Sequence, residues 1–145
     1  MIDQNIPDGH HVSRVCSKTR LTEDGSRPLP AAFKIRKIDE YLSVDWLEFL
    51  DSSGRPSQIK AVREMCEQRQ LRLKASAKFA VLNVGITKEW VKNGNTGNRK
   101  LFFVHQPKNQ EDSHSGIFNT NHSDNDLLIA TLISESVIEM HPCVA

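Results

Sequence analysis

The chain has 145 residues, of which 38% are hydrophobic, and this is enough to build the core of one domain. Nineteen basic and eighteen acidic residues leave a net charge of +1, so no overall field attracts nucleic acid. The mean hydropathy is −0.46, and no apolar run approaches the roughly 18 residues that a membrane span needs, so we expect no membrane protein.

The N-terminal segment, residues 1–9, is polar and rich in turn-forming residues, and we expect it to be loose. It lacks the basic region and apolar stretch of a secretory signal. The three cysteines, Cys16, Cys66 and Cys143, lie far apart and form no CxxC motif. Free thiols without a secretory signal are typical of the cytoplasm, where we expect the protein to reside.

In the first third of the chain, the hydrophobic pattern predicts two strands and a helix. Residues 12–16 form a candidate first strand, and residues 31–36 show the period-two alternation of a half-buried strand. Residues 39–50 carry apolar side chains at helical spacing, which favours a helix over most of this block. The alternative is that residues 41–44 end a strand and residues 46–50 form a brief helix.

The middle of the chain has the clearest signals. Residues 57–69 have one apolar and one charged side, which predicts an amphipathic helix. Residues 79–86 are almost continuously apolar, as in a central strand buried on both faces. The Asn- and Gly-rich residues 93–98 predict a hairpin turn, with residues 100–105 as the returning antiparallel strand.

The last third combines a long polar loop with an apolar helix. Residues 107–125 are polar apart from an island that contains Ile117 and Phe118. Ser123 and Asp126 resemble a capping box, after which residues 126–139 predict a helix that is apolar around most of its circumference. We therefore expect a single α+β domain over residues 1–145, with a mixed, mainly antiparallel sheet of about five strands and two or three helices.

Six histidines are the main candidates for chemistry. They show no HxxxH, HExxH or HxH spacing, so we expect neither a metal nor another cofactor. His11, with Ser13 two positions on, has the H-x-S form of phosphoesterases that use a tandem pair of such motifs, but a second motif is absent. One hypothesis is an enzyme acting on a phosphate ester or nucleic acid. His11 would act as one acid/base group and His114, or alternatively His105, as the other. Arg14 or Arg36 would hold the anion.

The preferred hypothesis is a small accessory or interaction protein, because the sequence contains no recognisable catalytic motif. Ile117 and Phe118 would either pin the long loop to the core or contact a partner. We expect that partner to be another protein or a second copy of the chain. The balanced charge does not favour nucleic acid.

Overall fold

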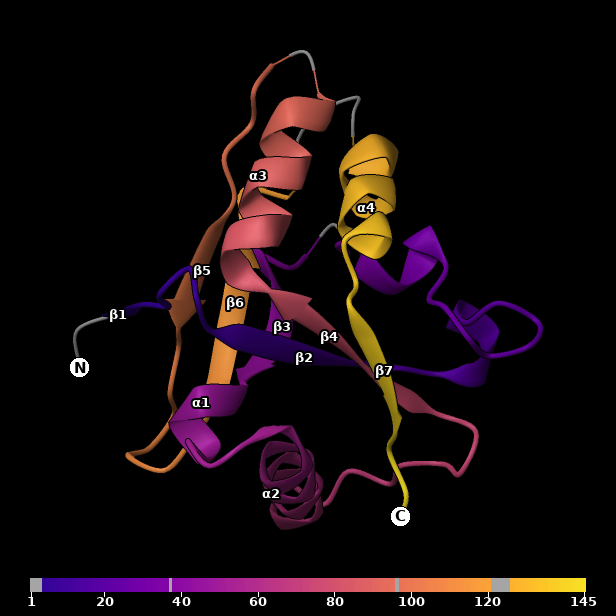
Figure 1. Ribbon diagram of the computed structural model, residues 1–145, viewed down its shortest axis with the longest axis vertical. Coiled ribbons are helices and arrows are strands. Elements are labelled where there is room, and N and C mark those ends of the chain that lie inside the picture. The colour runs from indigo at the N-terminus through magenta and orange to yellow at the C-terminus, as the bar shows by residue number, and fades with distance from the viewer. Residues whose placement is uncertain (1–3, 37, 96, 121–125) are drawn as a thin grey trace.

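The computed structural model describes residues 4–36, 38–95, 97–120 and 126–145, and its described part is built on one seven-stranded antiparallel sheet (Figure 1). In their order across the sheet, the strands are β1 (Gln4–Asn5), β5 (Phe102–His105), β6 (His114–Phe118), β3 (Tyr41–Trp46), β2 (His11–Cys16), β4 (Lys78–Asn83) and β7 (Glu139–Pro142). The α-helices are α1 (Leu47–Leu50), α2 (Arg55–Gln68), α3 (Val84–Gly94) and α4 (Asp126–Glu135). Two short 3-10 helices are η1 (Lys18–Arg20) and η2 (Pro30–Phe33). The expected α+β class is confirmed.

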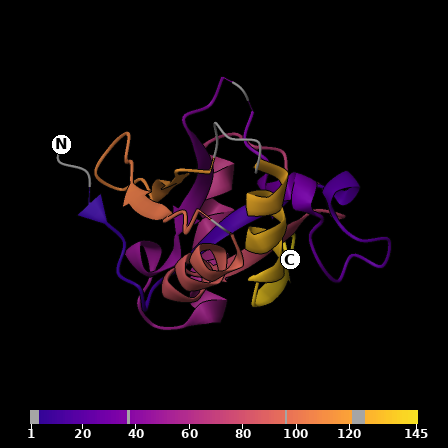
Figure 2. The same cartoon turned by 90° about the horizontal axis from the view of Figure 1, so that it is seen from above.

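Helices cover both faces of the sheet, which divides the core in two. On one face α3 and α4 lie side by side (Figure 2), and on the other face α1 and α2 pack together. Alternate residues of β4 enter the two cores: Ala80 and Leu82 join the first, Phe79 and Val81 the second. The expected burial of this strand on both faces is confirmed. None of the helices in the described residues is long and apolar enough to span a bilayer.

Two predictions for residues 31–50 are wrong. The predicted strand over residues 31–36 is replaced by η2, which begins at Pro30 and buries Ala32 and Phe33. The block over residues 39–50 is not mainly helical, because β3 occupies its first half and α1 follows. The alternative interpretation, a strand end followed by a brief helix, is closer. The apparent helical period was a coincidence: Leu42, Val44 and Trp46 also fit period two, and neighbouring strands on both sides pair with β3.

The predicted hairpin between residues 79–86 and 100–105 is also wrong. Strand β4 ends at Asn83, whose side-chain oxygen accepts a hydrogen bond from the Ile86 backbone N–H at 2.9 Å and caps α3. The Asn- and Gly-rich segment therefore follows a helix. Strand β5 pairs with β1 and β6, not with β4. Asn83, which the prediction included in the strand, is the residue that caps the start of α3.

Three further expectations need correction near the chain ends. Residues 4–5 of the N-terminal segment form β1 on the edge of the sheet. The predicted loop over residues 107–125 contains β6, which pairs with β3 and β5 in the interior of the sheet. The terminal helix stops at Glu135, and β7 pairs with β4. These strands escaped prediction because their partners, and not their own polar sequences, stabilise them. The Ser123 position of the predicted capping box lies outside the described residues.

Candidate anion-binding site

Arg14 fills a gap where two central strands separate. Strands β2 and β3 pair only at Val12 with Trp46 and at Ser13 with Asp45. Beyond this point the Arg14 Nε donates a hydrogen bond to the Ala32 carbonyl at 2.6 Å, and its Nη1 donates to the Ser43 carbonyl at 2.7 Å. The remaining terminal nitrogen, Nη2, has no hydrogen-bond partner within the described part of the chain. Arg14 therefore bridges the two strands and keeps donors available.

A pocket of about 290 Å³ opens beside Arg14, and cations dominate its lining. Arg14, Arg20, Lys34 and Arg36 contribute positive charge, against Asp39 alone. Asp39 forms a 2.7 Å ion pair with Arg36. Across residues 4–36, 38–95, 97–120 and 126–145, no carboxylate lies within ion-pair distance of the other three cations.

The environment of Arg14 is unfavourable for a charge as it stands. Burial lowers the pKa of the Arg14 guanidinium, and the like charges of Arg20 and Arg36 act in the same direction, while Cys16 and Asp39 oppose them in part. An arginine nevertheless stays protonated at neutral pH. A bound anion would offset both effects, and the planar donor fork of a guanidinium matches the oxygens of a phosphate. The pocket, called here the phosphate pocket, is therefore suited to an anion with more than one negative charge.

His114 adjoins the phosphate pocket through Ser43. Its Nδ1 lies 3.0 Å from the Gln106 carbonyl, which can only accept, so Nδ1 carries the proton. In the neutral imidazole Nε2 is then an acceptor, 3.4 Å from the Ser43 hydroxyl, and the ring centroid lies 5.8 Å from that of Tyr41. The Ser43 carbonyl binds Arg14 in turn. The structure thus brings two of the predicted site residues, Arg14 and His114, to one serine.

Gly116 determines how Tyr41 lies at the pocket wall. The Tyr41 ring covers Gly116 so closely that a Cβ at this position would overlap the ring, and it packs on Phe118 with centroids 4.8 Å apart. Ile117, the neighbouring residue, is completely buried in the core. The island that the sequence suggested as a binding surface therefore places Ile117 out of reach of a partner and Phe118 against Tyr41.

His11, the other predicted acid/base residue, lies apart from this pocket. Its backbone N–H donates to one Glu48 carboxylate oxygen at 2.7 Å, and its Nδ1 lies 2.6 Å from the other. Its Nε2 faces the Asn83 amide at 3.4 Å. Neither partner lines the phosphate pocket. The structure therefore does not bring His11 and His114 together.

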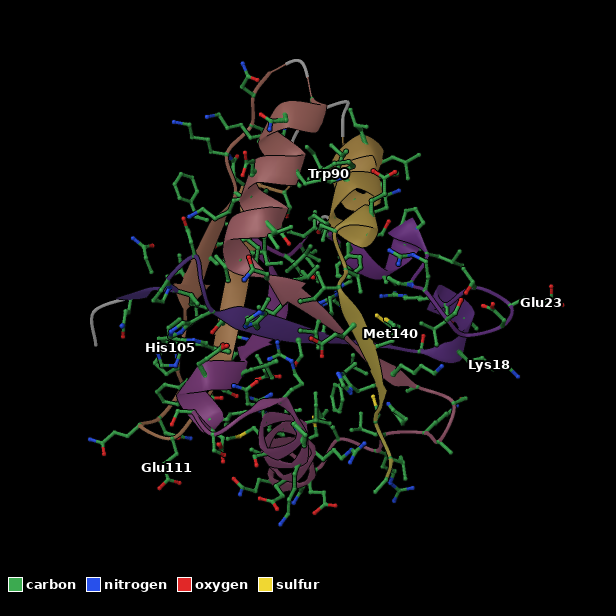
Figure 3. The ribbon with its side chains drawn as sticks, in the orientation of Figure 1. Lys18, Glu23, Trp90, His105, Glu111 and Met140 are labelled. Atoms are coloured by element: carbon green, nitrogen blue, oxygen red, sulfur yellow. The ribbon has the colours of Figure 1, made fainter. Side chains whose placement is uncertain are left out.

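His105 has a packing role at the end of β5 (Figure 3). Its Nε2 donates to the Asp112 carbonyl at 2.7 Å, and its ring lies tilted against Phe49 and edge-on to Trp46, with centroids 4.5 and 5.2 Å away. His10 accepts a hydrogen bond from the Trp46 indole at 3.0 Å. These contacts join α1 to the sheet.

A largely buried ionic network, which the sequence did not indicate, lies beside His114, whose backbone N–H donates to Asp112 at 3.0 Å. Arg69 at the end of α2 binds Asp45 at 2.8 Å and Asp112 at 2.6 Å, and Ser113 donates to Asp45 at 2.8 Å. Burial alone would raise the pKa of Asp112, but backbone N–H groups and Arg69 outweigh it and lower the value. The partners of Arg69 are 24 and 43 residues away, so no local motif could indicate them.

Sequence reasoning missed two of the four cations of the phosphate pocket. Arg36, the alternative to Arg14 as anion holder, lines it, but Arg20 and Lys34 come from loop and 3-10 segments, and their charges show no periodic signal. Within the described ranges, no three His, Cys, Asp or Glu side chains lie where they could hold a metal ion together. Comparison with models of known protein families, with curated proteins and with solved structures finds no significant match to this chain.

Proposed function

We propose that the protein binds a phosphate-bearing ligand in the phosphate pocket formed by Arg14, Arg20, Lys34 and Arg36. The observation that carries this proposal is the half-buried Arg14, which faces a cavity of about 290 Å³ and has no carboxylate partner among the described residues. Burying an unpaired charge is costly unless a ligand completes its interactions. The hydrogen bonds to Ala32 and Ser43 hold the guanidinium in place before a ligand arrives, which lowers the entropic cost of binding.

A phosphate fits this lining better than a carboxylate. Three cations remain without an acidic partner, so a ligand of charge −1 would leave repulsion between them. A phosphate ester carries up to two negative charges and three acceptor oxygens, which several guanidinium groups can share. The proposed ligand is of the same class as the substrate in the phosphate-ester hypothesis. A protein that binds such a ligand without catalysing its reaction would still have an accessory role.

Calorimetric titration with inorganic phosphate and pyrophosphate tests the proposal. The double variant Arg20→Gln/Lys34→Gln should weaken pyrophosphate binding by at least about tenfold, since each charge-assisted hydrogen bond contributes about 1.5–3 kcal/mol. Lys60→Gln/Lys92→Gln is the control, because it removes the same charge at exposed positions outside this pocket. Equal losses in the two double variants would mean that the overall charge, and not the pocket, attracts the anion.

A second candidate function is acid/base catalysis on the bound ester by His114. The specific observation is the Gln106 carbonyl at Nδ1, which leaves Nε2 as a free acceptor toward the Ser43 hydroxyl. A base in this position would remove a proton from a hydroxyl or water at the pocket wall. His114→Ala should then reduce hydrolysis of a phosphodiester panel by about a hundredfold, with pyrophosphate binding preserved. Unchanged hydrolysis in this variant would leave binding as the whole function.

A further inference from the structure

Ser43 and His114 form a hydroxyl–imidazole pair at the wall of a second cavity, of about 450 Å³. In the pairing of β3 with β6, His114 lies opposite Asp45, and Ser43 is two residues from Asp45 on the same strand. Side chains two residues apart on a strand share a face, so the Ser43 and His114 side chains point to the same side of the sheet. The helix α2 covers this side, because Arg69 at its end binds Asp45.

The His114 ring is oriented to accept the proton of the Ser43 hydroxyl. Its Nδ1 lies 3.0 Å from the Gln106 carbonyl, which can only accept, so Nε2 is the acceptor of the neutral ring. The Ser43 Oγ lies 3.4 Å from this Nε2, and such contacts often shorten when a substrate binds. A nucleophile, a base within reach of it and a third group that orients the base are the three parts of an activated serine. Ser43, His114 and the Gln106 carbonyl supply all three.

The backbone of both residues is fixed by hydrogen bonds, while the hydroxyl stays accessible. The Ser43 carbonyl accepts from Arg14 Nη1 at 2.7 Å. The His114 N–H donates to Asp112 at 3.0 Å, and its carbonyl accepts from the Gln106 N–H at 2.8 Å. Ser43 is nevertheless exposed, and His114 is half-buried. The two reacting groups are therefore held in place at a surface that a substrate can reach.

The lining of the second cavity suits a small uncharged group better than a phosphate. Asp45 and Asp112 bind the Arg69 guanidinium at the cavity wall, so it offers no free charge to a ligand. Met65 and Leu71 add apolar surface to the same wall, and Leu71 is 50% exposed. An apolar chain gains from covering this surface. The cavity therefore favours a neutral substrate with a short acyl chain.

The segment between β5 and β6 offers donors for a negative charge that develops during a reaction. The Asn109 Oδ1 accepts a hydrogen bond from the Glu111 N–H at 3.0 Å, which identifies the other atom of this side chain as the amide nitrogen. Among the described residues, this nitrogen has no acceptor. Asn109 and the exposed Lys108 both line the second cavity. Amide N–H groups and cations are the donors that stabilise an oxyanion.

We propose that Ser43 and His114 are the nucleophile and the base of an esterase site, and that its substrate is a small uncharged carboxylic ester held in the second cavity. The Ser43 Oγ attacks the ester carbonyl carbon, and its proton passes to His114 Nε2. The C–O bond to the alcohol breaks, His114 returns the proton to the leaving alcohol, and the acyl group stays on Ser43. Water then attacks the acyl group with its proton moving through His114, which releases the carboxylic acid and restores the serine. This activity is separate from phosphate binding and does not rest on it.

Two measurements on the full chain test the esterase site: hydrolysis of p-nitrophenyl acetate and butyrate, and mass spectrometry after treatment with a fluorophosphonate, which labels activated serines. The label should lie on Ser43, and Ser43→Ala should lose it and fall to the background rate. His114→Asn should slow hydrolysis by about a hundredfold, because its amide can still donate to the Gln106 carbonyl but supplies no base. Ser57→Ala is the matched control, because Ser57 is an exposed serine on α2 outside the cavity.

The outcomes separate the esterase site from the phosphate pocket. Equal hydrolysis by Ser43→Ala and Ser57→Ala, a label on another residue, or the absence of both turnover and label overturns the esterase site. A label on Ser43 with full activity in His114→Asn also overturns it, because the serine would then need no base. Ser43→Ala should keep its melting temperature and its pyrophosphate binding, since Arg14 contacts the Ser43 carbonyl and not the hydroxyl. Failure of pyrophosphate to bind the wild-type chain overturns the phosphate pocket and leaves the esterase site standing.

Discussion

At the scale of single residues, Arg69 shows how two carboxylates offset the cost of burying a positive charge. Burial alone would lower the pKa of its guanidinium, but Asp45 and Asp112 outweigh this and raise it above its usual range. Both carboxylates are largely buried, with side chains 13% and 7% exposed. Removal of Arg69 would leave two buried negative charges side by side, and breaking such a pair costs about 3–5 kcal/mol. The network therefore fixes the end of α2 on the sheet beside the site.

The lowered pKa of Asp112 predicts acid sensitivity. Because its pKa is lower in the folded than in the unfolded chain, where it is about 3.9, Asp112 stabilises the fold above that pH. The stabilisation is lost as the pH falls through the folded-state pKa. We expect urea unfolding to show a free energy that decreases below about pH 4. Asp112→Asn should be less stable at pH 7 and should show a shallower decrease. An identical pH dependence in both proteins would contradict this role.

At the scale of elements, β4 shows how one residue changes the structure that follows. Its apolar run continues beyond Asn83 in the sequence, yet the Asn83 side chain caps α3 and ends the strand. The segment up to Asn83 pairs with β2 and β7 and is buried on both faces. Ala80 and Leu82 of the strand and Val84 and Val91 of the helix enter the same core, so one apolar run serves both elements.

Leu82 tests the placement of β4. This leucine is completely buried, so Leu82→Asp should abolish soluble expression, because an unpaired buried charge costs several kcal/mol against a total stability of about 5–15 kcal/mol. Val15→Asp on the adjacent strand β2 should be tolerated, since Val15 is 37% exposed. The measurement is soluble yield together with thermal melting. A cooperative melt and normal yield for Leu82→Asp would refute the assignment.

At the scale of the whole molecule, two cores on opposite faces of one sheet hold the fold together. The larger core lies under α3 and α4, and the smaller lies under α1 and α2. The candidate site lies where β2 and β3 separate and no longer pair with each other. There the Arg14 side chain donates hydrogen bonds to the carbonyls of Ala32 and Ser43. The walls of the site come from residues 14–43, and β6, from the last third of the chain, brings His114 to Ser43 beside it.

This packing predicts a fold that needs no metal. Incubation with a chelator should leave the melting temperature unchanged, because two apolar cores already supply the stabilisation. A domain clipped by a structural zinc would lose on the order of 10 kcal/mol under the same treatment. Stoichiometric zinc in the purified protein, together with a large drop in melting temperature on chelation, would refute the prediction.

The sequence by itself determined the parts of this protein that depend on local periodicity. The strand around Val12 and the helix around Val62 are recognisable because side chains repeat every 2 or 3.6 residues, and the strand around Val81 because its sequence is apolar without interruption. Their combination was enough to predict the α+β class. Arg14 and His114 were candidates in the sequence, but nothing local indicated that both would contact Ser43.

Only the tertiary structure decided strand partners, and with them the site. Backbone hydrogen bonds between strands are almost independent of sequence, so β6 found its place between β3 and β5 through burial of Ile117 and close packing at Gly116. That pairing carries His114 to Ser43, and the separation of β2 from β3 brings Arg14 to the same residue. Single polar residues leave no periodic pattern in the sequence. Contacts between segments that are distant in the sequence decide which of them come together.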